Sequence, residues 1–338
     1  MRLLVTGGLG FIGSHFIRHT LANYPDDSVL NLDKMTYAGN PANLADVQKK
    51  FGSRYSHVRS DIADRPAVKA HVASYRPDAV VNFAAESHVD RSILDPETFV
   101  RTNVAGVHAL LEAVRELSVP RFLQVSTDEV YGEAHEGAFT ESTPLSPRSP
   151  YAATKAGGDV LALSYFTTFK TPVIVTRSAN AYGTHQYPEK LIPLFVTNLI
   201  EGKKVPLYGD GLHIRHWTHV VDHCTGINAA LRKGEPGHVY NLGSSEEREY
   251  TNADVARMIL SLFGKDRTHI EPAKDRLGHD RRYRVDSSKL RSLGWESEHN
   301  FENALEDIVK WYKENELWWK PIKSGEYKAY YEKQYVTS

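Results

Sequence analysis

Thr6-Gly7-Gly8-Leu9-Gly10-Phe11-Ile12-Gly13 joins a short apolar run to a helical pattern near the N-terminus. Glycine at positions 7 and 10 lets the backbone turn sharply and approach a pyrophosphate, while Gly13 lets the helix pack close to a sheet. The first turn of the helix then offers free N–H groups and a partial positive charge to that anion. The pattern predicts a dinucleotide-binding turn, with an ordinary tight turn as the alternative.

An acidic residue, Asp33, ends the next predicted strand about 20 residues after the glycines. A carboxylate there accepts hydrogen bonds from the adenosine ribose and repels a 2′-phosphate, which favours NAD over NADP. Lys34 follows at once and could soften that preference. The sequence therefore predicts NAD as the cofactor.

Outward from this unit, short apolar runs alternate with helical patterns. We expect strands at 3–6, 29–33, 57–59, 79–83, 122–126 and 173–176, and one well-marked helix, Pro96–Leu117, capped by Asp95. The alternation predicts an α/β fold in which residues 1–177 form a Rossmann-type, doubly wound parallel sheet, with a return segment near 216–242. Residues 178–338 are expected to form mainly a smaller substrate-binding lobe over the carboxyl ends of the strands.

Bulk composition excludes several classes of protein. Among 338 residues, 41 Lys and Arg face 42 Asp and Glu, which gives no support to nucleic-acid binding. No apolar run approaches the roughly 18 residues of a membrane span. Cys224 is the only cysteine, which excludes an internal disulfide and argues against structural zinc. We expect a cytoplasmic enzyme with no metal and neither a nucleic-acid nor a membrane partner.

Tyr151 and Lys155 stand four residues apart after Pro150, which suits the start of a helix, so both side chains share one face. A lysine ammonium near a phenol favours the phenolate and lowers the pKa of tyrosine from about 10. The pair predicts that Tyr151 is a base for hydride transfer. On an arbitrary helix the same spacing would be a solvated surface pair.

Asp128 and Glu129 follow the predicted strand 122–126, at the edge of the sheet where active sites assemble. Adjacent carboxylates repel each other, which raises the pKa of one of them, so an acid and a base can coexist near neutral pH. The doublet predicts acid–base chemistry at this edge. The alternative is a loop with two solvated acids.

Longer segments carry a family resemblance. Residues 32–40, 84–93, 127–129, 188–193, 278–283 and 318–327 are similar to the extended short-chain dehydrogenases/reductases and, within them, to the dTDP-glucose 4,6-dehydratases. The resemblance implies NAD-mediated oxidation of dTDP-glucose at carbon 4, elimination of water across carbons 5 and 6, and return of hydride to carbon 6. The product would be a 4-keto-6-deoxy sugar nucleotide.

The resemblance also assigns roles to residues. It implies that Tyr151 takes the proton from the hydroxyl at carbon 4, that Thr127 holds this hydroxyl, that Glu129 is the base at carbon 5, and that Asp128 protonates the hydroxyl leaving carbon 6. Expected cofactor-binding residues are Gly7, Gly10, Phe11, Ile12, Gly13, Asp33, Lys34, Thr36, Asp61, Ile62, Phe83, Ala84, Ala85, Ser87, Thr102, Tyr151 and Lys155. Expected substrate-binding residues are Ser87, Thr127, Asn180, Lys190, Leu191, Pro206, Tyr208, Arg215, Arg276 and His279.

Several departures from the family pattern leave the preferred nucleotide open. Ala181, Thr184, His216 and Leu277 replace the usual Asn, Pro, Asp and Pro, and the segment 243–252, around Glu246, lacks the expected substrate-binding Asn. We expect these changes to lie on the nucleotide and sugar-diphosphate side.

Two alternatives to a dTDP-glucose dehydratase stay open. One is another NAD-dependent nucleotide-sugar epimerase, decarboxylase or dehydratase acting on a different nucleotide; the Asp128-Glu129 doublet, which the sister epimerases lack, argues against an epimerase. The other is a noncatalytic NAD-binding scaffold, against which the intact Tyr151 and Lys155 argue.

Assembly is also predicted. In the extended family the helix at 96–117 and the helix that begins near Tyr151 pair across a twofold axis. Val160, Leu161, Leu163, Tyr165 and Phe166 give the second helix more apolar surface than one core-facing stripe needs. We expect a homodimer. Burial of both apolar faces within one subunit is the alternative.

Overall fold

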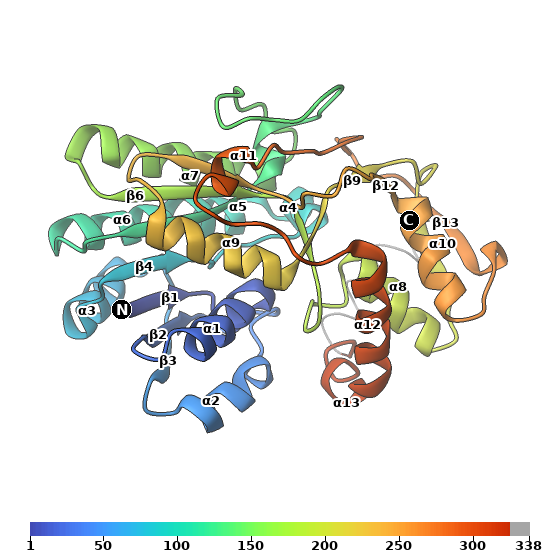
Figure 1. The fold of residues 1–338 in the computed structure, drawn as a ribbon, viewed down its shortest axis with the longest axis horizontal. Coiled ribbons are helices and arrows are strands. Elements are labelled where there is room, and N and C mark those ends of the chain that lie inside the picture. The colour runs from blue at the N-terminus through green and yellow to red at the C-terminus, as the bar shows by residue number, and fades with distance from the viewer. Residues whose placement is uncertain (325–338) are drawn as a thin grey trace.

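The computed structural model describes residues 1–324 and is built around a seven-stranded parallel sheet with the strand order β11-β6-β5-β4-β1-β2-β3 (Figure 1). The strands are β1 (Arg2–Thr6), β2 (Ser28–Asp33), β3 (Tyr55–Arg59), β4 (Ala79–Asn82), β5 (Phe122–Thr127), β6 (Val173–Ser178) and β11 (Val239–Leu242). The predicted Rossmann-type sheet is confirmed, and its six predicted strands end within two residues of their expected bounds. Gly325, Glu326 and Tyr327, which close the last family-like segment, lie outside the described residues.

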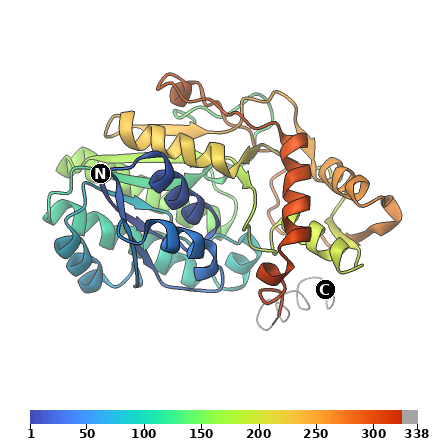
Figure 2. The ribbon, with the colours of Figure 1, turned by 60° about the horizontal axis from the view of Figure 1, so that its bottom comes forward.

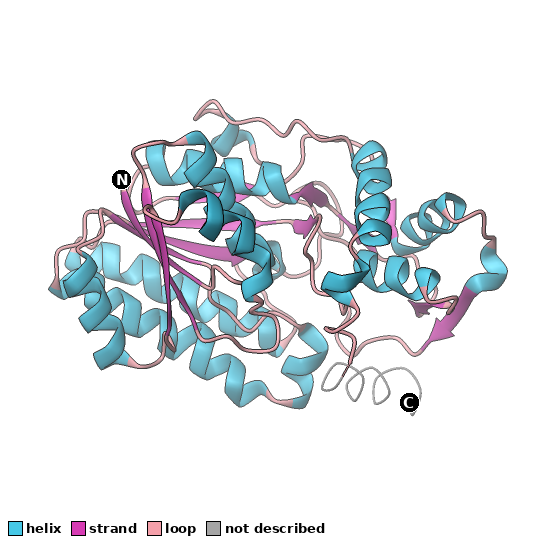
Figure 3. Ribbon diagram, turned by 90° about the horizontal axis from the view of Figure 1, so that it is seen from below, coloured by secondary structure: helices cyan, strands magenta, loops and turns pink. Residues whose placement is uncertain are grey.

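Both faces of this sheet are covered by helices, which explains why its strands are apolar on both sides (Figure 3). In β1, Leu3 and Val5 join a core cluster with α1 (Phe11–Asn23), α2 (Ala45–Phe51) and α9 (Val220–Lys233). Leu4, between them, joins the opposite cluster with α3 (Arg65–Tyr75), α6 (Val107–Glu116) and α7 (Pro150–Phe169). Parallel strands end at the same edge, so this packing brings their carboxyl ends together.

The helix expected at 96–117 is continuous but not uniform. It consists of α5 (Pro96–Val100), a π-helical segment (Arg101–Gly106) and α6, and α4 (Val89–Leu94) precedes it. Within the π segment, Asn103 donates to Glu86 O and Thr154 Oγ1, each at 3.0 Å, and accepts from Glu86 N at 3.0 Å. The irregular turn therefore ties the loop after β4 to α7.

Residues after β6 build a second lobe beside the strand ends. Its helices are α8 (Leu191–Ile200), α10 (Asn252–Leu262), α12 (Phe301–Glu314) and α13 (Glu316–Trp319), and Figure 2 shows α12 on the side that faces the parallel sheet, with α10 farther out. Three two-stranded sheets complete it: β7 (Asn180–Tyr182) with β10 (Trp217–His219), β8 (Val205–Tyr208) with β13 (Ile270–Ala273), and β9 (Ile214–Arg215) with β12 (Tyr250–Thr251).

The chain returns to the parallel sheet after entering this lobe. Residues 220–242 supply α9, which packs against α1, and the edge strand β11. The short helix α11 (Ser288–Arg291) packs on β11 and α9 as well, although it lies far into the second half of the chain. No helix within residues 1–324 has the length and apolar character to cross a membrane.

Candidate active site

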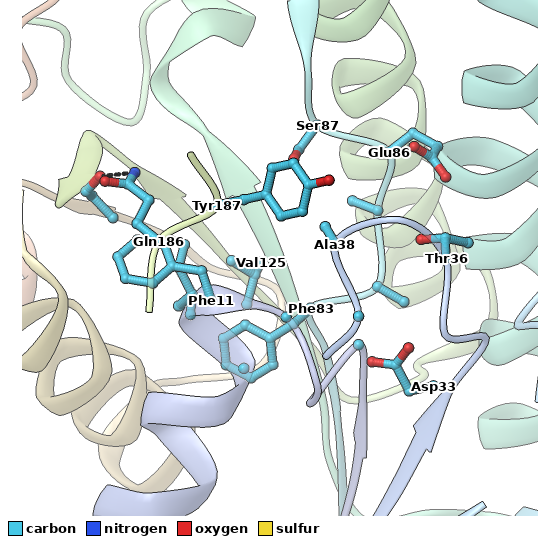
Figure 4. A pocket seen from close by; sticks show the side chains of 18 of the residues that line it. Phe11, Asp33, Thr36, Ala38, Phe83, Glu86, Ser87, Val125, Gln186 and Tyr187 are labelled. Atoms are coloured by element: carbon cyan, nitrogen blue, oxygen red, sulfur yellow. Dashed lines mark hydrogen bonds between the residues drawn. The ribbon is translucent and has the colours of Figure 1, made fainter. Parts of the chain in front are cut away.

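A deep cleft runs along the carboxyl ends of the parallel strands. In Figure 4, Asp33 and Thr36 lie at one end of the cleft and Gln186 at the other, with Phe11, Phe83 and Val125 between them. All the residues expected to bind the cofactor line this cleft, from the glycine turn through Asp61, Ile62, Ala84, Ala85 and Thr102 to Tyr151 and Lys155. Thr127, Asp128 and Glu129 line it too.

The glycine turn fits closely against its surroundings. Gly7 has a φ of +68°, and a Cβ there would lie 2.6 Å from Ala84 N at the end of β4. A Cβ at Gly13 would lie 2.4 Å from Gly7 O, so the close approach at Gly13 is to the turn itself and not, as expected, to the sheet. Only Gly7 O at 3.3 Å would be near a Cβ at Gly10. Any side chain at Gly7 or Gly13 would therefore displace backbone.

Asp33 at the end of β2 is buried and fixed by backbone donors. Its carboxylate accepts from Leu9 N at 2.9 Å and Met35 N at 2.7 Å. Burial raises the pKa of Asp33, although these two hydrogen bonds lower it. Lys34 pairs with Asp61 at 2.9 Å, and Arg101 pairs with the same carboxylate at 3.0 Å. The charge of Lys34 is thus balanced by Asp61. Lys34 is therefore less suited to attract a 2′-phosphate and so to oppose the preference of Asp33 for NAD.

The acidic doublet lies in the 3-10 turn Asp128–Tyr131 directly after β5. Thr127 Oγ1 donates to Asp128 Oδ1 at 3.2 Å and accepts from Glu129 N at 3.3 Å. Burial, and then the charge of Glu129, raise the pKa of Asp128 to about 8. Burial also raises the pKa of Glu129, but Arg215 and Arg276 oppose that shift. Near neutral pH, Asp128 therefore carries a proton that it can donate, and Glu129 has cationic support for its charge.

The pair on α7 differs from the expectation in one respect. Lys155 Nζ donates to Val125 O at 2.6 Å, and burial lowers the pKa of Lys155 to about 8. The pKa of Tyr151 is raised, first by burial and then by Glu129 and Asp128, while a hydrogen bond with Thr127 opposes the shift. The prediction that Lys155 lowers the pKa of Tyr151 is wrong for the protein alone, because burial and the charges of the two carboxylates raise that pKa.

A second pocket adjoins the cleft and shares Ser87, Glu129, Asn180 and Lys190 with it. Leu191, Pro206, Tyr208, Arg215, Arg276 and His279, which were also expected to bind substrate, line this pocket, whereas Thr127 lines only the cleft. Since Glu129 lies where cleft and pocket meet, a molecule in the pocket can reach both Glu129 and the cofactor cleft.

Cations in this pocket are held in place by neighbouring groups. Lys190 Nζ donates to Ser87 O at 3.0 Å, and the Arg215 guanidinium lies 4.5 Å from the centre of the Tyr283 ring. Arg276 forms a two-point ion pair with Asp90, with Nε to Oδ1 at 2.5 Å and Nη2 to Oδ2 at 3.0 Å. The three cations are pre-positioned for an anion such as a diphosphate.

Near the far end of this pocket, His279 Nδ1 lies 2.7 Å from Asp275 Oδ1, and His213 Nε2 lies 3.5 Å from Asp275 Oδ2. Within residues 1–324 this is the one group of side chains close enough together to hold a metal ion. The two imidazoles stack 3.7 Å apart with planes 16° from parallel, so one ion could not lie in the plane of both rings at bonding distance from each. We assign no metal to the group.

Most of the departures from the family pattern lie outside both pockets, contrary to expectation. His216 Nε2 contacts Ser244 O at 2.8 Å, and Glu246 accepts from Phe301 N at 3.3 Å at the start of α12. Thr184 and Leu277 do not line either pocket, and Leu277 is exposed. Ala181 lines both. The lining of the two pockets is therefore less altered than the sequence suggests.

The expectation that segment 243–252 lacks a substrate-facing asparagine is also wrong. Asn252 lines the second pocket, and its buried Oδ1 has no hydrogen-bond partner among the described residues. β12 pairs with β9, and Thr251 caps α10, which turns Asn252 toward the pocket. The insertion before it obscures this position in the sequence.

Sequence reasoning missed other residues that line the cleft: Glu86, Gln186, Glu189, His223 and Trp318. His223 is buried, and neither ring nitrogen has a hydrogen-bond partner among the described residues. The only sequence signal for Glu86 and Glu189 is that each lies in a segment that resembles the family. Trp318 has the same signal, since it lies in the family-like segment 318–327. His223 sits on α9, and nothing in the sequence of that helix indicates that it reaches the cleft.

Comparison with known proteins places this site in a family. The family model described as GDP-mannose 4,6 dehydratase matches residues 4–308. The chain belongs to this family. It is the group of NAD-dependent epimerases and dehydratases, within the extended short-chain dehydrogenases/reductases, that the motifs resemble.

Individual family members are similar over nearly the whole chain. A low-salt glycan biosynthesis protein of Haloferax volcanii is 49% identical over 312 residues, 92% of this chain and 98% of the relative. A dTDP-glucose 4,6-dehydratase of Streptomyces antibioticus is 47% identical over 329 residues, 96% of each. The crystal structure of DesIV, a dTDP-glucose 4,6-dehydratase from Streptomyces venezuelae with NAD and TYD bound, is 48% identical with a TM-score of 0.92, covering 96% of this chain and 100% of that one.

Proposed function

We propose that this chain dehydrates dTDP-glucose to dTDP-4-keto-6-deoxyglucose and uses NAD as its cofactor. One observation carries the proposal: Asp128 is buried in the wall of the cofactor cleft, and Glu129 beside it lines both that cleft and the substrate pocket, close to Tyr151. Relatives that are 40–49% identical over nearly their full length, and named dTDP-glucose 4,6-dehydratases in most cases, support the same activity.

The cleft fits NAD. Gly7 and Gly13 keep the start of α1 free of side chains, so its first N–H groups can meet a pyrophosphate. Asp33 is a buried carboxylate that favours a free ribose and disfavours a 2′-phosphate. Bound NAD would accept a hydride from carbon 4 of the sugar and return it to carbon 6.

Tyr151 would remove the proton from the hydroxyl at carbon 4. Its phenol is neutral in the protein alone because burial and the two carboxylates raise its pKa. A positive charge placed beside it would lower that pKa, and an oxidised nicotinamide would carry such a charge. Thr127, which hydrogen-bonds the phenol, would hold the sugar hydroxyl at the same point.

Elimination would then follow at the doublet. A ketone at carbon 4 acidifies the hydrogen on carbon 5, which Glu129 would remove. Asp128 would protonate the hydroxyl that leaves carbon 6. The opposed environments of the two carboxylates suit these roles, since Asp128 is protonated near neutral pH and Glu129 faces Arg215 and Arg276.

The second pocket would hold the nucleotide diphosphate, which makes residues 178–338 mainly the substrate-binding lobe. Lys190 and Arg215 would meet the phosphates, and Tyr208 and Pro206 would flank the base. Asn252 adds an amide to this surface. Dinucleotide binding would fall to residues 1–177 with the return segment 216–242.

We also propose that the chain forms a homodimer in the cytoplasm. Leu94 on α4, Val100 on α5 and Val160 and Phe169 on α7 are each more than half exposed, and these three helices pack against one another. Paired apolar helices of this kind suit a twofold interface. Cys224 is a buried free thiol, as is common in a reducing compartment.

The test is a product assay. Purified protein is incubated separately with dTDP-, UDP-, GDP- and CDP-glucose without added nicotinamide, and the 4-keto product is detected by its absorbance in alkali. We expect product from dTDP-glucose in preference to the others. Epimerised sugar without a 4-keto product would instead identify an epimerase.

A further inference from the structure

The segment 315–324, which contains α13, follows α12 and reaches the cofactor cleft from the substrate lobe. Two of its side chains, Trp318 and Ile322, line that cleft, together with Gly10, Phe11 and Ile12 of the glycine turn and the start of α1. A segment more than 300 residues away in sequence thus forms part of the wall of the cleft that contains the turn where a pyrophosphate would lie.

This segment is anchored firmly to the substrate lobe. Trp319 is fully buried, and its Nε1 donates to Tyr312 O of α12 at 2.8 Å. Lys323 Nζ donates to Asn198 Oδ1 and Glu201 Oε2 at the end of α8, both at 2.9 Å. These contacts stay within one lobe and do not touch the glycine turn.

Trp318 connects this segment to the cofactor-binding part of the chain. Its Nε1 donates to Asn43 Oδ1 at 2.9 Å. Asn43 is buried, and its Nδ2 donates to Leu9 O at 2.9 Å, inside the glycine turn. Arg18 on α1 donates to Asn43 O at 2.6 Å. The indole of Trp318 is therefore linked through one side chain to the backbone that would bind the pyrophosphate.

From this arrangement we infer that Trp318 retains the cofactor: it closes the pyrophosphate side of the cleft and sets the rate at which NAD is released. The inference rests on the proposed use of NAD. A redox-neutral cycle needs no exchange of cofactor between turnovers, so slow release of NAD does not lower the turnover rate. Release requires the 315–324 segment to separate from Asn43, because the indole bridges the two walls of the cleft.

The experiment compares two neighbouring tryptophans in the purified, NAD-loaded enzyme, with no sugar present. Trp318→Phe keeps an aromatic ring but removes the N–H that reaches Asn43. Trp319→Phe removes a hydrogen bond of similar length that stays within the substrate lobe. Bound NAD is exchanged against labelled NAD, and the residual NAD is measured after gel filtration.

We expect Trp318→Phe to release NAD about 3- to 10-fold faster than wild type, the range produced by the loss of one hydrogen bond. Trp318→Ala, which also removes the wall, should release it faster still. Trp319→Phe should leave the release rate unchanged even if it lowers the melting temperature.

Unchanged release from Trp318→Phe and Trp318→Ala would overturn the inference, as would equal acceleration by Trp319→Phe, which would indicate general loosening of the lobe. Neither result would touch the proposed dehydratase activity, which the product assay tests separately. Wild-type protein that binds no NAD would overturn both.

Discussion

At the scale of single residues, the chemistry depends on how burial divides the roles of two adjacent carboxyl groups. Burial raises the pKa of both groups; Glu129 raises the pKa of Asp128 further, whereas Arg215 and Arg276 oppose the shift at Glu129. The result is one proton donor and one supported anion. A pair of solvated acids would both be ionised near neutral pH and could not supply the acid.

This division predicts the pH dependence of dehydration. The pKa of Asp128 is raised to about 8, so its acid form predominates below that pH and is lost above it. The dehydration rate at saturating sugar should therefore fall as pH rises through about 8. Its dependence on pH is measured by single-turnover product formation. A rate that stays constant well into the alkaline range would show that Asp128 is not the proton donor.

The same pKa shift predicts an effect on stability. The folded state holds a proton on Asp128 that the unfolded state loses above about pH 4. The contribution of Asp128 to folding stability therefore falls as pH rises from about 4 to 8. Asp128→Asn removes this dependence, so the variant should be more stable than wild type, increasingly so toward pH 8. Thermal unfolding at several pH values measures it. A variant that is less stable at every pH would contradict the buried-acid account.

The sequence is informative about those residues whose chemistry depends on residue type and spacing. The glycine turn, Asp33, the doublet and the Tyr151/Lys155 pair are all recognisable in this way, and each lines the cleft. Spacing does not show which atom a flexible side chain contacts. Lys155 bonds to Val125 O, and Asn252 reaches the pocket only because β12 and the start of α10 turn it there.

At the scale of elements, the strands of the main sheet are predictable and the short ones are not. Strands buried on both faces are runs of apolar residues, as at Leu3–Val5, and such runs stand out. β9 and β12 have two residues each, and they form because distant segments meet. The edge strand β11 follows α9 in a region where strand-like and helical patterns do not alternate regularly. The sequence therefore predicted a return of the chain to the main sheet near 216–242, but not the strand itself.

The π segment is an element that the periodic pattern conceals. Apolar residues at helical spacing predict one helix over 96–117, and the extra residue per turn at Arg101–Gly106 hardly disturbs that pattern. Its effect is to aim Asn103 at Glu86 and Thr154. Gly158 on α7 lies against this turn, where a Cβ would be 2.5 Å from Asn103 O.

Asn103→Ala should therefore destabilise the protein by about 1–3 kcal/mol, because it removes two hydrogen bonds to the half-buried backbone of Glu86 and a buried one to Thr154. Denaturant unfolding measures the free energy. Glu97→Ala, on the exposed part of α5, is the matched control and should change stability by less than about 0.5 kcal/mol. Equal changes in the free energy of unfolding for the two substitutions would show that the hydrogen bonds of Asn103 do not stabilise the protein.

At the scale of the whole molecule, the exposed side chains of α4, α5 and α7 predict assembly. Val160 is 54% exposed and Phe169 52% exposed on the same helix that carries the buried Tyr151 and Lys155. Light scattering at micromolar concentration should report a dimer, and Val160→Glu should shift it toward monomer by placing a charge in the interface. A wild-type monomer under these conditions would contradict the prediction.

The central claim, that one molecule carries separable oxidation and elimination machinery, is tested most directly with the doublet variants. With dTDP-glucose, Asp128→Asn and Glu129→Gln should still oxidise carbon 4 and accumulate reduced nicotinamide, while product formation falls by about 10²–10⁴-fold. Glu129→Gln should also stop solvent deuterium from entering carbon 5. Tyr151→Phe should suppress every step, including the accumulation of reduced nicotinamide. Near-normal dehydration by both carboxylate variants would contradict the account and leave an epimerase-like activity as the better explanation.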